Sequence, residues 1–237
     1  GKRRTGKIYG KQALRCSSEL SGRVRAMNGL SRLLPTATLF LALALGARFA
    51  AFSVEPFGTQ RVNLDTGVTT LPQGGILTDR ENGLRLKAGY IEYKEGSFVR
   101  ARSAELLSEG ETFLAQSLEH DIPKQEARFS GLSFSNPDFK GLKAERALAL
   151  FAEEIVVLKG RVQAESPRLQ AEALVVNLKG REALALGSFT YQEGKATLRG
   201  QGANARLYLR FASGKVQAST KVPPSASPLA QYAARLP

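Results

Sequence analysis

Hydrophobic and polar residues alternate with a period of two along most of the chain from Leu84 onward. Successive side chains of a strand point to opposite sides, so this alternation predicts half-buried β-strands. The clearest runs are residues 84–88, 173–178 and 206–211. Gly-containing pairs predict the turns between strands. These pairs are Glu95-Gly96, Glu109-Gly110, Ser130-Gly131, Lys159-Gly160, Lys179-Gly180, Glu193-Gly194 and Ser213-Gly214.

The alternating region also repeats itself. An apolar-x-small tripeptide recurs in steps of 27, 29, 27 and 29 residues. Its copies are Leu86-Lys87-Ala88, Phe113-Leu114-Ala115, Leu142-Lys143-Ala144, Leu169-Gln170-Ala171 and Leu198-Arg199-Gly200. A Gly-x-apolar tripeptide recurs as Gly96-Ser97-Phe98, Gly160-Arg161-Val162, Gly187-Ser188-Phe189 and Gly214-Lys215-Val216. Self-similarity at this period predicts an array whose units cover one another's apolar faces.

Two segments, 101–107 and 142–154, are rich in Ala and Leu and have helix propensity. Both lie in register with copies of the repeat that alternate like strands, so we expect strands there, with a short helix near 101–107 left open. The last segment, 221–237, contains four prolines among Ser and Ala residues and is expected to be a disordered tail.

The N-terminal region differs from the rest in charge and hydropathy. Residues 1–26 hold eight Lys or Arg and one acid, whereas residues 53–237 hold 24 and 20. Met27 and Arg32 precede an apolar run, 33–47, typical of a secretory signal. Residues 27–52 are therefore expected to be a signal peptide or a membrane anchor. Residues 1–26 are read as an unstructured extension upstream of the true start, or else as a genuine basic tail.

Composition excludes several function classes. The folded region is only mildly basic and its cations are spread over the strands, which argues against nucleic-acid binding. Cys16 is the only cysteine, so no disulfide within one chain is predicted. His120-Asp121 lacks a nucleophile motif and His120 reads as an ordinary strand residue. No residues have metal-ligand or dinucleotide-loop spacing. The protein is predicted not to be an enzyme and to need no cofactor or metal.

Two stretches, Ile155–Ala164 and Leu169–Val176, resemble the OstA-like domain of the LptA and LptC family of periplasmic lipopolysaccharide-transport proteins. The resemblance covers residues 75–218 and is clearest over 142–218. It departs from the family pattern where Asn or Asp is replaced by Arg161, Ser188, Glu145 and Glu172.

The resemblance implies an all-β fold of repetitive antiparallel strands, an open folded-over β-jelly roll over residues 53–220, after one N-terminal hydrophobic helix. It implies a non-enzymatic bridge in the periplasm or cell envelope that binds and transports lipopolysaccharide or another glycolipid. It also implies pairing of the end strands with similar domains or with further copies. The residues expected to line the lipid groove are Leu148, Leu150, Val162, Leu174, Val176, Leu178, Leu184, Leu186, Phe189, Leu207 and Leu209.

A second interpretation keeps the same strands but assigns no cargo. In it, the chain is a structural scaffold of the envelope that polymerises edge to edge. Large apolar residues that face a gap favour the lipid-binding interpretation, and tight interdigitation of small and large residues favours the scaffold.

Overall fold

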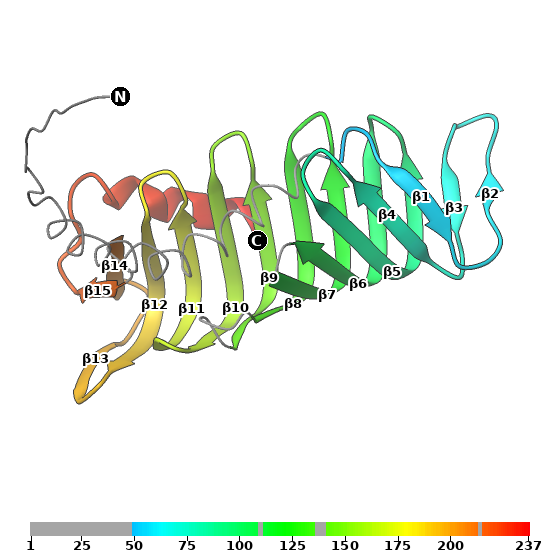
Figure 1. Ribbon diagram of the computed structural model, residues 1–237. Coiled ribbons are helices and arrows are strands. Elements are labelled where there is room, and N and C mark those ends of the chain that lie inside the picture. The colour runs from blue at the N-terminus through cyan, green and yellow to red at the C-terminus, as the bar shows by residue number, and fades with distance from the viewer. Residues whose placement is uncertain (1–48, 109–110, 136–140, 213–214) are drawn as a thin grey trace, which may run out of the picture. The chain divides into compact units, whose positions relative to one another are not determined.

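The computed structural model describes residues 49–108, 111–135, 141–212 and 215–237 (Figure 1). The chain divides into two units, residues 1–32 and 33–237, and every described residue belongs to the second. The expected basic extension and the expected hydrophobic helix, up to residue 48, lie outside the described residues.

The described residues form one antiparallel sheet of 15 strands (Figure 1). The strands are β1 (Ser53–Pro56), β2 (Arg61–Val62), β3 (Thr69–Leu71), β4 (Gly75–Asp79), β5 (Leu84–Lys94), β6 (Phe98–Ser108), β7 (Glu111–Asp121), β8 (Glu126–Ser135), β9 (Leu142–Leu150), β10 (Ile155–Glu165), β11 (Arg168–Asn177), β12 (Glu182–Glu193), β13 (Ala196–Gly200), β14 (Arg206–Ala212) and β15 (Lys215–Ser219). From β4 to β12 each strand pairs with the next along the chain. The path ends at β1 and β15, which pair with β4 and β14 respectively, so the sheet is open.

The predicted all-β antiparallel fold is confirmed, and the repeat has a simple structural meaning. Copies of the apolar-x-small tripeptide fall in β5, β7, β9, β11 and β13, so one repeat is a pair of adjacent strands. Of the two helix-prone segments, 101–107 lies within β6, and 142–154 comprises β9 and the turn that follows it. Pairing with neighbours on both sides satisfies their backbone groups and buries their Ala and Leu side chains, which outweighs helix propensity.

Strands β5 to β9 and β11 change their facing near the middle, whereas the interior residues of β10 and β12 keep one alternation throughout. In β9, Leu142 and Ala144 face the interior before this point, and Ala147 and Ala149 face it afterwards. In β5 to β12 the residue pairing is interrupted near the middle of each strand, and we name the residues at these interruptions the corner row. The corner row consists of Gly89, Ser103, Gln116, Gly131, Glu145, Gly160, Glu172 and Gly187. Along this row the sheet folds over, and the curved strands are visible in Figure 1.

The corner row explains two of the glycines that recur in the repeat, Gly160 and Gly187, and also Gly131. Gly131, Gly160 and Gly187 have positive φ values of +60°, +80° and +81°, and a Cβ on any of them would collide with the side chain across the strand. Those side chains are Gln116, Glu145 and Glu172 respectively. At Gly160 and Gly187 the pairing register also shifts, which marks a β-bulge.

Two of the predicted turns were therefore wrong. Ser130-Gly131 and Lys159-Gly160 lie inside β8 and β10 rather than between strands. Sequence alone does not distinguish the two cases, because a bulge and a turn both require positive φ and both select glycine. The pairs at Gly96, Gly180 and Gly194 do lie in turns, whereas Glu109-Gly110 and residues 213–214 are outside the described residues.

Substitution of Gly187 measures the contribution of the corner row. Gly187→Ala is expected to lower the free energy of unfolding by about 1–2 kcal/mol for the positive φ alone, and further because Glu172 must move. Gly194 has φ +57°, and no atom lies within 4 Å of an added Cβ. Gly194→Ala should therefore lower the free energy of unfolding only by the contribution of the positive φ. Urea unfolding measures both variants. Equal losses in the two variants, with no recovery in Gly187→Ala/Glu172→Ala, would contradict a role for the contact.

The expected disordered tail is also wrong. Residues 227–235 form the 3₁₀ helix η2 (Ser227–Arg235), and Ala226, Leu229 and Leu236 are buried against the sheet. The prolines are compatible with this segment, since Pro228 stands in the first turn, where a missing N–H costs no hydrogen bond. The helix packs against β10, β11 and β12.

Candidate functional site

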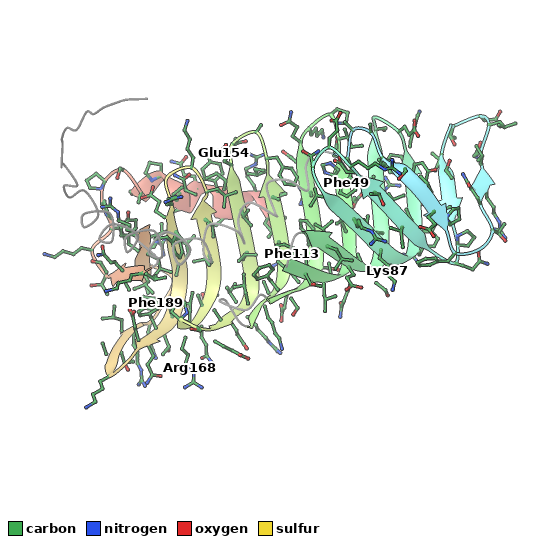
Figure 2. The ribbon with its side chains drawn as sticks, in the orientation of Figure 1. Phe49, Lys87, Phe113, Glu154, Arg168 and Phe189 are labelled. Carbon is green, nitrogen blue, oxygen red and sulfur yellow. The ribbon has the colours of Figure 1, made fainter. Side chains whose placement is uncertain are left out.

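The folded-over sheet encloses a continuous apolar interior. It extends from Leu71 in β3 to Leu209 in β14 and is built from every second residue of the intervening strands. Phe113 and Phe189, labelled in Figure 2, belong to it, whereas Lys87 and Arg168 are exposed and point away. A sheet that presents large apolar side chains on its concave face requires a cover, and here the fold at the corner row supplies most of it.

The remaining part of the cover comes from a residue outside the sheet. Phe49 is 4 % exposed and lies in the interior beside strands β5 to β8 (Figure 2). Its ring is 6.2 Å from the ring of Phe52, which in turn is 5.2 Å from Tyr93, both in edge-to-face geometry. The residual cavity beside Phe49 is only about 10 Å³, close to the smallest that admits one water molecule. The cavity is lined by Phe49, Leu86, Val99, Leu106, Leu118, His120, Ala127 and Phe129.

His120 is part of this interior, as a strand residue of β7. It is 2 % exposed, its Nδ1 lies 3.3 Å from the carbonyl oxygen of Glu126, and its ring packs edge-on against Phe151. This agrees with its interpretation as an ordinary strand residue. Among the described residues, no three His, Cys, Asp or Glu side chains come together as a metal site would require.

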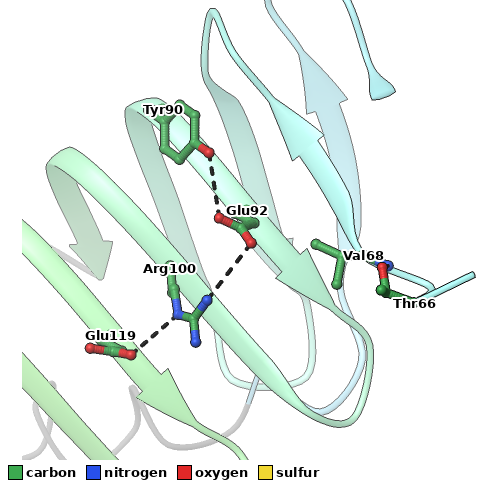
Figure 3. Close-up of polar contacts among 6 residues, drawn as sticks. All are labelled: Thr66, Val68, Tyr90, Glu92, Arg100 and Glu119. Atoms are coloured by element: carbon green, nitrogen blue, oxygen red, sulfur yellow. Dashed lines mark hydrogen bonds and ion pairs between the residues drawn. The ribbon is translucent and has the colours of Figure 1, made fainter. Parts of the chain in front are cut away.

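The outer face of β5 to β8 is polar and open to solvent. Arg100 forms ion pairs with Glu92 at 3.7 Å and with Glu119 at 3.2 Å, so charges of alternating sign cross three strands (Figure 3). The Tyr90 hydroxyl donates to Glu92 at 3.4 Å. Ladders of this kind solubilise a sheet face and contribute little to stability. We therefore assign no binding role to this half of the outer face.

On β9 to β12 one half of the outer face is apolar, and the C-terminal segment packs against it. Leu148, Val157, Val175 and Leu184 are directly opposed across these strands and lie beneath η2. Arg235 fixes the end of the helix through ion pairs with Glu126 at 2.6 Å and Glu153 at 2.8 Å.

A tyrosine of η2 also contributes to the docking of the helix. Burial and a hydrogen bond to Glu153 raise the pKa of the Tyr232 hydroxyl, which keeps that hydroxyl protonated and able to donate.

The structure divides the predicted lining residues between the two faces. Seven of them lie in or against the interior: Val162, Leu174, Val176, Leu178, Phe189, Leu207 and Leu209. The other four lie on the outer face under or beside the C-terminal segment: Leu148, Leu150, Leu184 and Leu186. In the runs 147–150 and 183–186, Ala and Leu alternate, and the alanines rather than the leucines face the interior.

Comparisons with known proteins give a likeness to solved structures. No family model matches the sequence, and no curated protein matches it. Among solved structures, the chain is similar to the crystal structure of LptH, the LptA-homologous periplasmic component of the lipopolysaccharide transport device of Pseudomonas aeruginosa. The sequence identity is 10 %, the alignment covers 75 % of this chain and 99 % of that chain, and the TM-score is 0.26.

Two features of the site were missed by sequence reasoning. Phe49 lies just after the apolar run and was included in the expected signal or anchor, yet it packs in the interior. The C-terminal cover has a signal in retrospect, since Ala226, Leu229, Ala233 and Leu236 recur at spacings of three and four. Within the described part of the chain, no helix has the length and hydropathy of a membrane span.

Proposed function

We propose that the chain is a non-enzymatic lipid-binding protein whose interior holds the acyl chains of lipopolysaccharide or another glycolipid and passes them along the sheet. The single observation that carries the proposal is Phe49, a side chain from outside the sheet that fills the interior between β5 and β8. An interior that accepts one off-sheet apolar group can accept another, and an acyl chain has the same apolar character.

The geometry supports conduction as well as binding. The described buried side chains from β3 to β14 are apolar apart from Thr69, Asp79 and His120. The Asp79 carboxylate, at the end of β4, accepts hydrogen bonds from the backbone N–H and the side-chain amide of Asn82. An acyl chain could therefore move from strand to strand with its apolar contacts renewed at each step, and without burial of an unpaired charge on the way. The sequence resemblance to the OstA-like domain points to the same cargo class.

The open edges supply a means of assembly. Strands β1 and β15 each pair with a neighbouring strand along one edge only. The other edge of each strand is unpaired, and an unpaired strand edge is a template for a further strand. We propose that these edges pair with similar domains or with further copies of this chain, which would join successive interiors into one bridge. Residues 53–220 would form the bridge unit in the periplasm or cell envelope. Of residues 27–52, the part before Phe49 would export or anchor it, since Phe49 itself packs in the interior.

The scaffold interpretation has one observation in its favour. The cavity beside Phe49 is about 10 Å³, so this part of the interior is packed almost completely. A scaffold would keep this packing permanently, whereas a lipid carrier would exchange Phe49 for cargo. Native mass spectrometry of protein purified from the envelope discriminates the two, since co-purified glycolipid is expected only for the carrier.

Photo-crosslinking tests lipid contact in cells. Phe129 faces the interior beside Phe49, and its neighbour Arg128 is exposed on the outer face. p-Benzoylphenylalanine at position 129 is expected to give lipid adducts on irradiation, because its ring replaces a phenylalanine ring in the proposed path. The same residue at position 128 should give none. Mass spectrometry of the irradiated protein identifies the adduct.

Two results would contradict the proposal. One is the absence of lipid adducts at position 129 while circular dichroism shows the protein folded. The other is equal adduct yield at positions 128 and 129, which would indicate non-specific contact with membranes.

A further inference from the structure

The outer face carries a second hollow, separate from the interior. It has a volume of about 340 Å³ and lies beside the C-terminal helix. Ala233 of η2 forms one rim, and the corner-row glycines Gly160 and Gly187 form another. The hollow is lined by Arg146, Lys159, Gly160, Glu172, Ala173, Leu186, Gly187, Ala203, Arg206 and Ala233.

The pairing register gives this hollow a defined order of residues. Arg146, Lys159, Ala173, Leu186 and Arg206 are successive direct partners across β9, β10, β11, β12 and β14. The floor is therefore apolar, with two cations at one end and one at the other. With about 4.8 Å between neighbouring strands, the backbone positions of Lys159 and Arg206 are roughly 14 Å apart.

The two cations at one end are poorly compensated. Arg146 and Lys159 are directly opposed on adjacent strands, and like charges in that position destabilise a sheet. Neither forms an ion pair with a carboxylate in the described part of the chain, whereas Arg161, close by, is paired with Glu145 at 3.3 Å. Among the described residues that line the hollow, Glu172 is the only acidic one and three are basic, so together they carry a net positive charge.

The third cation is held in place by the backbone. The Nη1 of Arg206 donates to the carbonyl oxygens of Ala203 at 2.7 Å and Ala205 at 2.8 Å. A guanidinium group has five N–H donors, so its Nε and Nη2 donors remain for a ligand. A pre-positioned guanidinium loses little entropy when it binds an anion.

We propose that this hollow binds a phosphate group carried on an apolar body, a phosphomonoester amphiphile. A phosphomonoester has up to two negative charges and three acceptor oxygens, enough to bridge Arg146 and Lys159 and to relieve their repulsion. The apolar body would lie on Ala173 and Leu186 toward Arg206. The hollow is on the face opposite the interior, so the proposal does not depend on acyl-chain transport.

A local fluorescence probe tests the proposal in the full chain. The sequence has no tryptophan, so Ala203→Trp, at an exposed position that lines the hollow, introduces a single reporter. The probes are dihexanoyl phosphatidic acid, dihexanoyl phosphatidylcholine and inorganic phosphate, titrated at constant ionic strength. We expect a saturable emission change with phosphatidic acid and much weaker responses to the other two.

Matched variants identify the groups responsible. Arg146→Gln/Lys159→Gln should weaken phosphatidic acid binding about tenfold or more. Arg199→Gln/Lys215→Gln removes the same charge from exposed positions on β13 and β15 and should leave the affinity unchanged. The first pair should unfold in urea at or above the concentration needed for the parent, because the substitutions remove a like-charge contact.

Four results would overturn the proposal. The first is no saturable response to phosphatidic acid, and the second is equal affinity in the two double variants. Inorganic phosphate bound as tightly as the lipid would assign the hollow to the free ion. If phosphatidylcholine bound as tightly as phosphatidic acid, the hollow would not recognise the phosphomonoester group.

Discussion

Removal of residues 221–237 is expected to lower the free energy of unfolding by about 5 kcal/mol or more and to cause aggregation. The segment buries Ala226, Leu229 and Leu236, and its loss would expose the outer-face leucines and valines beneath η2. Each large apolar side chain moved into water costs roughly 1.5–3 kcal/mol, and several would move together. Urea unfolding and light scattering of the truncated protein measure the two effects.

A point substitution separates the apolar cover from its ion pairs. Arg235→Gln removes the contacts with Glu126 and Glu153 but leaves Leu229 buried. Because these groups are partly exposed, the expected loss is about 1 kcal/mol or less. A truncated protein that stays monomeric with the parent's stability would show that the C-terminal segment is not a structural cover.

Phe49→Ala is expected to destabilise the lipid-free protein by about 3 kcal/mol and to increase lipid capture. The substitution removes an aromatic ring that is 4 % exposed and leaves an apolar cavity between β5 and β8. A lipid chain that enters this cavity restores the lost contacts. The melting temperature should therefore fall without lipid and recover when glycolipid is added. The yield of adducts from p-benzoylphenylalanine at position 129 should also rise.

Phe57 provides the matched control. It is 50 % exposed, so Phe57→Ala should change neither the melting temperature nor the adduct yield by a measurable amount. If Phe49→Ala is destabilised equally with and without lipid, and the adduct yield is unchanged, Phe49 is a structural plug and does not occupy the place of cargo.

Much of the fold was predictable from the sequence because strand periodicity persists through the repeat. Residues 84–88, 173–178 and 206–211 lie in β5, β11 and β14 as predicted, apart from Leu178 just beyond β11. The in-phase repeat also outweighed the helix propensity of residues 142–150, which form β9. The alternation of apolar and polar residues within a strand involves only residues close in sequence, so the sequence pattern is enough to predict the strand.

The facing of the strands was only partly predictable. Leu148 and Leu184 were expected in the groove, because large apolar side chains were assigned to it wherever alternation was present. In β9 the alternation shifts at the corner row, and no turn residue marks the shift at Glu145. In β12 the alternation does not shift, and the small residues Ala183 and Ala185 face the interior in place of the leucines beside them. The C-terminal segment is the second reason why these leucines were assigned to the groove. No cover was expected for the outer face, so that face was expected to be polar and its leucines were not expected there.

The corner row also determines how the chain could change in length during evolution. Each repeat unit carries its own bend, so a duplicated pair of strands inserted in phase would meet the same Gly-and-Glu contact on both sides. Such an insertion would lengthen the interior by roughly 10 Å, two strand spacings, and leave the units on either side unaltered. The length of the interior would therefore change in steps of one pair of strands. Selection for a longer interior would act on the number of repeat units.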